Sequence, residues 1–482
     1  MKRSANLCFV CLFFIVFVFE AHADIKLPAI FGDNMVLQQQ SDVAVWGWTK
    51  PHVGVTVTSS WDRKSYSVKS DAKGHWRVKM LTPVAGFTPH TLTISDGKSV
   101  TLNNILIGEV WICSGQSNME MPMRGYRDQP VEGGPEAIAS STNQGIRCFT
   151  MKKNSKTTPQ DDCTGTWEVA NPQTTPEFTA TGYFFGRLIN QALNVPIGLI
   201  HTSWGGSSIE AWMTPNSLKD IPEKPVPASD DDIKSPIGTP TMLYNGMIHP
   251  IVGYGIRGAI WYQVEANRNE PALYVKMFEA MVCEWRHLWG VGEFPLYYCQ
   301  IAPYNYVGGI NSAYIREAQA KGMTTTPNTG MAVLMDAESV DCIHPPKKRD
   351  AGERLALWAL AETYGMDKMH YRSPILKSFE TEGRLVVLTF DMDETPGLAT
   401  GREILNPGLT SYGKEILNFR IAGKDKQFYP AKAAYLGNKV FVFSPLVLEP
   451  VAVRYCFDDT SATELFTVEG NLPVSSFRTD DW

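Results

Sequence analysis

The stretch that decides the fold is residues 105–119, ILIGEVWICSGQSNM. Residues 105–113 are an almost continuous apolar run, which is typical of a strand buried on both faces of a sheet. The run breaks at Ser114-Gly115, and Ser117 follows in the turn. A serine is a poor nucleophile unless a histidine takes its proton, so Ser117 would need a histidine from elsewhere in the chain. On its own the motif favours a plain polar turn, because Met119 replaces the last glycine of a Gly-x-Ser-x-Gly elbow.

Beyond this strand, apolar runs alternate with helical patterns as far as residue 364. Strands are predicted at 197–202, 256–263, 294–302 and 331–335, and helices at 179–193, 271–289, 312–321 and 346–364. This alternation predicts an α/β fold, with a mainly parallel sheet covered on both faces. Ligands in such sheets bind outside the carboxyl ends of the strands, so the residues that follow strands are the candidates for a site.

The two ends of the chain follow a different pattern. Short alternating runs separated by turn residues predict antiparallel β structure in both regions. We therefore expect an N-terminal β domain over residues 24–104, an α/β domain over 105–372 and a C-terminal β region over 373–482. Two polar, Pro-rich insertions at 152–177 and 215–240 are expected to be active-site walls or mobile surface loops.

The first 23 residues have the features of a secretion signal. Lys2 and Arg3 precede an apolar run over residues 7–19, and Ala21-His22-Ala23 offers a cleavage site with small residues. The run is too short for an ordinary transmembrane helix. We expect a signal peptide over residues 1–23, a mature chain from Asp24 and a secreted or periplasmic protein; an uncleaved anchor is the alternative. No later stretch is apolar enough to span a membrane.

Composition narrows the classes of partner. The formal net charge is −6 and no basic block occurs, which argues against nucleic acid. Of nine cysteines, Cys8 and Cys11 lie in the predicted signal, and the rest are an odd, scattered set that does not form a disulfide framework. Cys148 and Cys163 lie in one polar region and could pair. Neither a CxxC nor an HExxH motif occurs after residue 23, so we expect no metal and no cofactor.

Two further clusters follow predicted strands or precede a helix. Gly205-Gly206 comes just after a strand, and paired glycines let backbone amides face a ligand closely, as an oxyanion hole requires. A plain tight turn is the alternative. Asp341 and His344 are separated so that both can project from one loop, with Asp341 holding the imidazole in one tautomer. A helix-capping aspartate beside a surface histidine is the alternative.

A third strand end, residues 261–267 (WYQVEAN), is rich in hydrogen-bonding side chains. Gln263 could donate its amide to a developing oxyanion. Glu265 could instead be half of a carboxylate pair, as in a glycosidase. Its possible partners are Glu109, Glu210 and Asp336. A glycosidase would leave Ser117, the glycine pair and His344 unexplained, whereas an esterase uses all of them.

With these clusters in place, the chain resembles a known family. Residues 108–119, GEVWICSGQSNM, look like the nucleophile block of the sialate O-acetylesterases, which are carbohydrate esterases of the SGNH-hydrolase superfamily. Other similar blocks are 243–250 (LYNGMIHP), 258–267 (GAIWYQVEAN), 316–319 (REAQ), 343–345 (IHP) and 471–480 (NLPVSSFRTD). The resemblance covers nearly the whole mature chain. It implies a flavodoxin-like three-layer domain flanked by β-sandwich regions.

The resemblance also implies roles for single residues. Ser117 would be the nucleophile, His344 the general base and Asp341 the residue that orients it, with Asp336 and Glu338 as weaker candidates for the acid. The implied oxyanion hole consists of the backbone amide of Ser117, an amide at Gly205 or Gly206, and the side chain of Gln263.

The sequence departs from the family at one of these positions. Val264 stands where the family usually has glycine, and a β-branched residue disfavours positive φ. Gln263 is therefore expected to be turned differently here.

The resemblance favours 9-O-acetylated sialic acids as substrate, and acetylated xylan or another polysaccharide is the alternative. A sialic acid carries a carboxylate, so a fixed arginine would favour it; Arg124, Arg127 and Arg316 are candidates, each with a structural salt bridge as the plainer role. Trp204 and Glu265 are further candidate substrate contacts. A glycan-binding protein with a decayed esterase site is the alternative from a different class.

Overall fold

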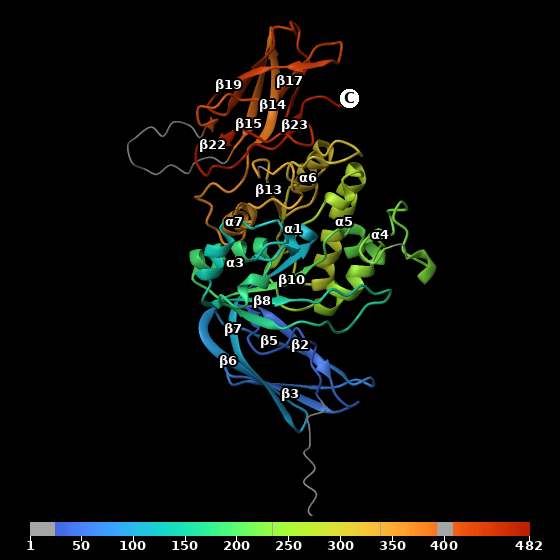
Figure 1. Ribbon diagram of the computed structural model, residues 1–482. Coiled ribbons are helices and arrows are strands. Elements are labelled where there is room, and N and C mark those ends of the chain that lie inside the picture. The colour runs from blue at the N-terminus through green and yellow to red at the C-terminus, as the bar shows by residue number, and fades with distance from the viewer. Residues whose placement is uncertain (1–24, 234, 338, 393–407) are drawn as a thin grey trace, which may run out of the picture.

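The structure is a computed structural model that describes residues 25–392 and 408–482, apart from residues 234 and 338 (Figure 1). The predicted signal peptide and Glu338 lie outside the described residues. The central sheet has the order β13-β12-β11-β7-β10-β8-β9, and its neighbouring strands pair in parallel except for β9. The strands are β7 (Ser99–Gly115), β8 (Asn143–Thr150), β9 (Trp167–Ala170), β10 (Ile197–Ser203), β11 (Gly258–Tyr262), β12 (Leu296–Cys299) and β13 (Thr329–Ala332). The predicted α/β class is confirmed.

Helices cover both faces of this sheet. The long helices are α3 (Ala180–Leu193), α5 (Pro271–Trp289), α6 (Ala313–Thr325) and α7 (Lys348–Trp358), and the short ones are α1 (Ser117–Glu120), α2 (Gly134–Ala139) and α4 (Pro215–Leu218). Helix α3 packs on α7, and α5 packs on α6. Alternate side chains of β7 enter different cores: Val110 and Ile112 join the core that holds the buried side of α5, whereas Trp111 and Cys113 join that of α3 and α7. This explains the continuous apolar run in the sequence, because a strand buried on both faces has no polar side.

The N-terminal β region is built onto the same sheet. Its strands are β1 (Val36–Gln38), β2 (Asp42–Trp48), β3 (Gly54–Ser59), β4 (Ser65–Lys69), β5 (His75–Leu81) and β6 (Gly86–Ser95). Strand β7 pairs with β6 through its first half and with β10 and β11 through its second half. One strand therefore crosses the predicted boundary between residues 104 and 105, and β2 and β5 form a separate antiparallel pair.

The C-terminal region consists of antiparallel sheets at the other end of the molecule (Figure 1). One sheet has the order β14-β15-β20-β19 and the other β18-β17-β21-β23, with β16 and β22 as a further pair. Their bounds are β14 (Ile375–Glu382), β15 (Leu385–Asp391), β16 (Leu409–Thr410), β17 (Phe419–Ala422), β18 (Phe428–Pro430), β19 (Lys432–Leu436), β20 (Lys439–Phe443), β21 (Ala452–Tyr455), β22 (Phe466–Thr467) and β23 (Phe477–Arg478).

Two general features bear on the expectations from sequence. Cys148 and Cys163 are both free thiols, so the suggested pairing is not made. Among the residues that the structure describes, no helix has the length and apolar character needed to cross a membrane.

Candidate active site

Ser117 lies at the carboxyl end of β7, between the ends of β10 and β11. Gly115 is in register with Ser203 of β10 and Tyr262 of β11, so the three strands end side by side. The chain leaves β7 through Gly115 at φ +134°, where an added Cβ would lie 2.2 Å from the carbonyl oxygen of Tyr262. Ser117 then begins α1 with its side chain partly exposed. The strands that follow β7 in sequence lie on both sides of it, and such a switch point is where open α/β sheets bind ligands.

His344 is joined to this turn by two contacts. Its ring packs edge-on against Tyr126, with ring centroids 5.2 Å apart, and the Tyr126 hydroxyl donates to the Ser117 carbonyl at 3.3 Å. Asn118, the residue after Ser117, donates from Nδ2 to the carbonyl of Ile343 at 3.1 Å. The predicted nucleophile and base thus belong to neighbouring segments, although they lie far apart in the sequence.

The imidazole of His344 has a partner that sequence reasoning did not find. Its Nδ1 lies 2.7 Å from Oε1 of Gln129. An amide oxygen accepts hydrogen bonds, so Nδ1 carries the hydrogen and Nε2 keeps a lone pair, which is the tautomer of a general base. Burial, together with the charge of Lys348, lowers the pKa of His344 to about 4. The histidine is therefore neutral at neutral pH.

Neither of the two described carboxylates proposed to orient His344, Asp341 and Asp336, makes a hydrogen bond to its ring. Asp341 is exposed, in a turn. Asp336 accepts two hydrogen bonds from the guanidinium of Arg354, at 2.7 and 2.6 Å. Glu338 lies outside the described residues. Among the described residues, the side chain that the structure shows at Nδ1 is that of Gln129.

A buried polar network supports the nucleophile turn from below. Asn118 donates from Nδ2 to Oε1 of Glu265 at 2.6 Å, and its Oδ1 accepts from Nζ of Lys348 at 2.6 Å. Burial lowers the pKa of Lys348 to about 7, even though the charge of Glu265 opposes this shift. Burial also raises the pKa of Glu265. Glu265 therefore holds Asn118 in place, and this is a structural use for a side chain that sequence suggested as a substrate contact.

The glycine pair after β10 lies directly against Ser117. A Cβ added at Gly205 would be 3.2 Å from the Cβ of Ser117, so a larger residue would crowd the nucleophile. The amide of Gly205 already donates to Oε2 of Glu120. Gly206 has φ +76°, and its amide and that of Ser117 make no hydrogen bond to any described residue. These two amides are free to face a ligand.

Gln263 is fully buried and its donors are in use. Its Nε2 donates to the carbonyl of Ser207 at 3.1 Å and to Oδ1 of Asn267 at 2.8 Å. One hydrogen of the amide thus holds the turn that contains the glycine pair, and the other holds Asn267 in the segment after β11. Val264 has φ 176°, which lies outside the left-handed region that favours glycine, so this position does not need a glycine for a positive φ.

The other predicted substrate contacts divide into two groups. Trp204 is partly exposed beside Gly205, with the ammonium of Lys153 5.5 Å from its ring and 2.6 Å from Glu120. Arg316 is buried, where it donates to the hydroxyls of Ser312 and Ser476, so it ties α6 to the C-terminal region.

The two remaining arginines are exposed and each has an acidic neighbour. Arg124 pairs with Glu177 at 2.7 Å, and Arg127 lies 3.6 Å from Asp128. Trp204, by contrast, directly precedes the glycine pair in the sequence.

The carboxylate pairs that would indicate a glycosidase are not favoured by the geometry. Glu109 is in register with Ile197, at the start of β10 and hence at the opposite edge of the sheet from Ser117. It accepts hydrogen bonds from Arg257 and Tyr364. Glu210 is held by Lys224 at 2.8 Å and by Asn267. Among the described residues, no group of three His, Cys, Asp or Glu side chains is arranged to hold a metal ion.

Sequence reasoning missed four residues of this site: Asn118, Tyr126, Gln129 and Lys348. Asn118 could have been noticed, because it follows the predicted nucleophile. Lys348 lies in the polar run Lys347-Lys348-Arg349, which looks like a solvated helix start, and nothing local indicates its burial. Gln129 contacts His344 across 215 positions of sequence.

Comparisons with known proteins show which family the chain resembles. The model of the family described as carbohydrate esterase, sialic acid-specific acetylesterase, matches residues 107–358. The sialate O-acetylesterase of Rattus norvegicus is 30% identical over 431 residues, which are 76% of this chain and 79% of that protein. The sialate O-acetylesterase of Homo sapiens is 28% identical over 396 residues, or 74% of each chain. A crystal structure of a carbohydrate acetylesterase from Xanthomonas citri superimposes with a TM-score of 0.84 at 36% identity, covering 95% of this chain and 100% of that one.

Proposed function

The chain belongs to the sialic acid-specific acetylesterase family of carbohydrate esterases, and on this basis we propose that it removes 9-O-acetyl groups from sialic acids with Ser117 as nucleophile and His344 as general base. One observation carries the assignment. The segments of Ser117, the glycine pair and His344 meet at the switch point of the sheet, where Gly205 lies against Ser117 and Asn118 binds the carbonyl of Ile343.

The chemistry follows from the proposed roles. Nε2 of His344 takes the proton of Ser117 as Oγ attacks the acetyl carbonyl, which gives a tetrahedral intermediate. The bond to the sugar oxygen breaks, and the imidazolium returns the proton to that oxygen. Water, deprotonated by the same imidazole, then attacks the acetyl-enzyme, and acetate leaves as Ser117 regains its proton.

The oxyanion needs donors that are not already in use. The amides of Ser117 and Gly206 meet this condition, and we assign the oxyanion hole to them. Gly205 contributes space, because it has no side chain to fill the volume beside Ser117. Gln263 acts through Ser207, whose carbonyl it binds, and so keeps the glycine pair in position. To donate to the oxyanion itself, Gln263 would have to give up its hydrogen bond to Ser207 or the one to Asn267.

The fold and the export of the chain fit the same proposal. Leaving out β8, the parallel strands run β10-β7-β11-β12-β13, which is the 2-1-3-4-5 order of flavodoxin-like sheets. This order supports assignment to the SGNH hydrolases. The signal-like residues 1–23 support export to the periplasm or the cell exterior, where acetylated glycans occur.

The ionisation of His344 predicts an unusual pH dependence. Only the neutral imidazole can accept a proton, and its pKa lies at about 4. We expect kcat/KM for 4-nitrophenyl acetate to keep its plateau value down to this pH and to fall about tenfold per unit below it. A carboxylate on Nδ1 would raise the pKa of His344 instead. An acid limb at or above the ordinary value of 6.5 would therefore assign the orienting role to Asp341 rather than Gln129.

Lys348 provides a second test of the same ionisation. Its positive charge helps to lower the pKa of His344, so Lys348→Met should move the acid limb to higher pH. The neighbouring Lys347 donates to the carbonyl of Asp336 at 3.3 Å, and Lys347→Met is the matched control that should leave the limb in place. If the acid limb of kcat/KM lies at the same pH in both variants, the charge of Lys348 does not act on His344.

The substrate is tested by acetate release from two glycans side by side. The mature protein is given a 9-O-acetyl sialoside and acetylated xylan at equal acetyl concentration. We expect kcat/KM to be at least ~10-fold higher for the sialoside. A preference for xylan would leave the proposed esterase mechanism in place but would show that the substrate is an acetylated polysaccharide and not a sialic acid. A protein that releases acetate from neither glycan but binds one of them would be a glycan-binding module with an inactive site.

A further inference from the structure

A second candidate site lies on the N-terminal β region, on the outer face of the β2–β5 pair. Trp46 faces Arg77 across this pair, and Trp48 faces His75. Strands alternate between faces, so all four side chains emerge on one side, while their neighbours Val45 and Trp76 enter the core on the other. The guanidinium of Arg77 lies 5.1 Å from the Trp46 ring, and the His75 ring meets Trp48 edge-on at 6.1 Å. Two partly exposed indoles thus form one platform.

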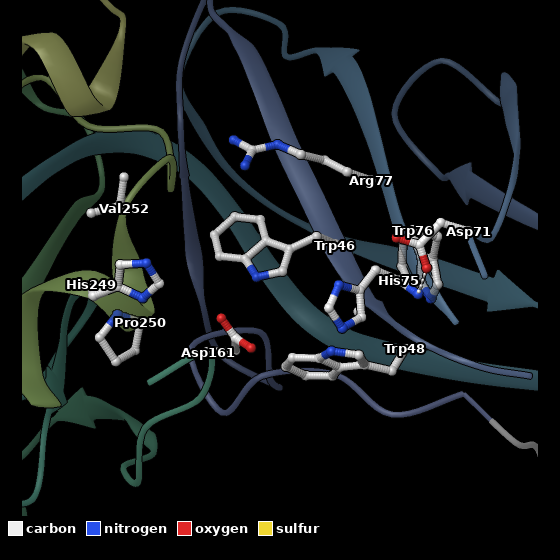
Figure 2. A pocket seen from close by; sticks show the side chains of 11 residues that line it. Trp46, Trp48, Asp71, His75, Trp76, Arg77, Asp161, His249, Pro250 and Val252 are labelled. Carbon is white, nitrogen blue, oxygen red and sulfur yellow. Dashed lines mark hydrogen bonds between the residues drawn. The ribbon is translucent and has the colours of Figure 1, made fainter. Parts of the chain in front are cut away.

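The platform forms one wall of a pocket of about 450 Å³ (Figure 2). The opposite wall comes from His249 and Val252, which precede β11, and Asp161 projects from the 152–177 insertion between the two indoles. The volume lies within the range of ligand pockets, roughly 300–1,000 Å³. The pocket is therefore formed by four separate segments of the chain: β2, the region of β5, the 152–177 insertion and the residues before β11.

The polar groups at this pocket have few protein partners. The guanidinium of Arg77 and the carboxylate of Asp161 form no ion pair or hydrogen bond with any described residue. The indole N–H groups of Trp46 and Trp48 likewise donate to no described residue. Trp46 also packs on Phe31. The ammonium of Lys26 lies 5.4 Å from the Trp48 ring, so both indoles have packing partners. The polar groups named above have no hydrogen-bond partner among the described residues, and their arrangement points to a ligand.

The chemistry of these groups fits a sugar ring. The face of a pyranose carries C–H bonds whose positive polarisation matches the negative face of an indole. Its rim carries hydroxyls that donate to a carboxylate and accept from a guanidinium or an indole N–H. Because Arg77 and Asp161 have opposite charges, the pocket has no strong preference for an anion. We propose that this pocket is a non-catalytic binding site for one or two neutral pyranose residues of a glycan.

The pocket and the catalytic turn are linked by one insertion and lie toward opposite ends of the central strands. Lys153 of this insertion pairs with Glu120 of α1, whereas Asp161 lines the pocket. The eight-residue separation corresponds to at most ~28 Å of extended chain. The pocket also lies beside the residues that precede β11, at the amino ends of the strands, whereas Ser117 lies at their carboxyl ends. The site therefore helps with long glycans and not with small esters.

The test uses the full mature chain with Trp48→Ala. The matched control is Trp61→Ala, since Trp61 also meets a histidine edge-on, His90 at 5.8 Å, on the N-terminal region but outside the pocket. Binding of sialyllactose and xylohexaose is measured by calorimetry in the Ser117→Ala background, which removes turnover. We expect Trp48→Ala to weaken binding of at least one oligosaccharide ~10-fold or more, and Trp61→Ala to have no effect.

Two further measurements keep this result separate from the esterase proposal. With Ser117 present, hydrolysis of 4-nitrophenyl acetate should be the same in Trp48→Ala and wild type, which also shows that the variant folds. Asp161→Asn, which keeps the shape of the pocket and removes a charge, should also weaken oligosaccharide binding. The proposal is overturned if neither oligosaccharide binds, or if both bind equally well in Trp48→Ala and Trp61→Ala.

Discussion

Ser117→Ala is expected to lower kcat for acetyl esters by roughly 10⁴- to 10⁶-fold, the largest effect of any single change in this protein. The alanine leaves the free amides of residues 117 and 206 in place but removes the hydroxyl that we propose forms the acetyl-enzyme. The residual rate would come from water attacking the bound ester. The measurement is acetate release under single-turnover and steady-state conditions, with rapid quench to look for the acyl intermediate.

Ser203, at the end of the neighbouring strand β10, provides a matched control for this variant. Ser203 ends β10 and lies 2.5 Å from Nε2 of His201, so it too is a serine beside a histidine. Both side chains are buried, which keeps them from a glycan in solution. Ser203→Ala should therefore keep activity within about tenfold of wild type. If Ser203→Ala were inactive and Ser117→Ala active, the nucleophile would have been assigned to the wrong strand end.

His344→Ala is expected to lower kcat by a similar factor, on the order of 10⁴-fold or more, because Ser117 then has no base. The double variant Ser117→Ala/His344→Ala should be no slower than the slower single variant, since the two residues act as a unit. His287→Ala, an exposed histidine on α5, is the control and should match wild type.

Chemical rescue distinguishes a missing base from a disturbed fold. The half-buried site of His344 lies against Tyr126, so its removal leaves a space into which imidazole from solution can enter. We expect added imidazole to restore part of the activity of His344→Ala and none of that of Ser117→Ala. Rescue of both variants, or a His344→Ala protein with more than about one tenth of wild-type activity, would remove His344 from the role of base.

Much of the fold could be predicted because it depends on local periodicity. Helix α5 has the predicted bounds, and α3 begins one residue after the predicted start, where Thr179 caps it by accepting from the amide of Gly182. The predicted helix over residues 346–364 is α7 followed by a π-helical turn at Ala359–Thr363. The β structure expected after residue 373 includes β15 and β20. Where each strand pairs was not predictable, because β7 serves two regions at once.

The residues at the strand ends show which features of the site the sequence pattern predicts and which it does not. Parallel strands place their carboxyl ends at one edge of the sheet, so the sequence alone predicts that Ser117 and the glycine pair lie close together. The side-chain partners within that edge could not be expected. Gln263 uses both amide hydrogens on Ser207 and Asn267, and His344 contacts Gln129. These contacts depend on the path of loops that have no periodicity.

The sequence by itself determined the α/β class, the β regions at both ends, the family and the positions of Ser117, Gly205 and His344 as candidates, since each depends on residue type and spacing along the chain. Only the tertiary structure decided that Lys348 is buried against Asn118, that Gln129 faces His344, and that Trp46 and Trp48 share a pocket with Asp161. These contacts join segments separated by more than a hundred residues, and they shift charges through burial. Whether a side chain is buried depends on which distant segments cover it, and the local sequence pattern does not predict those segments.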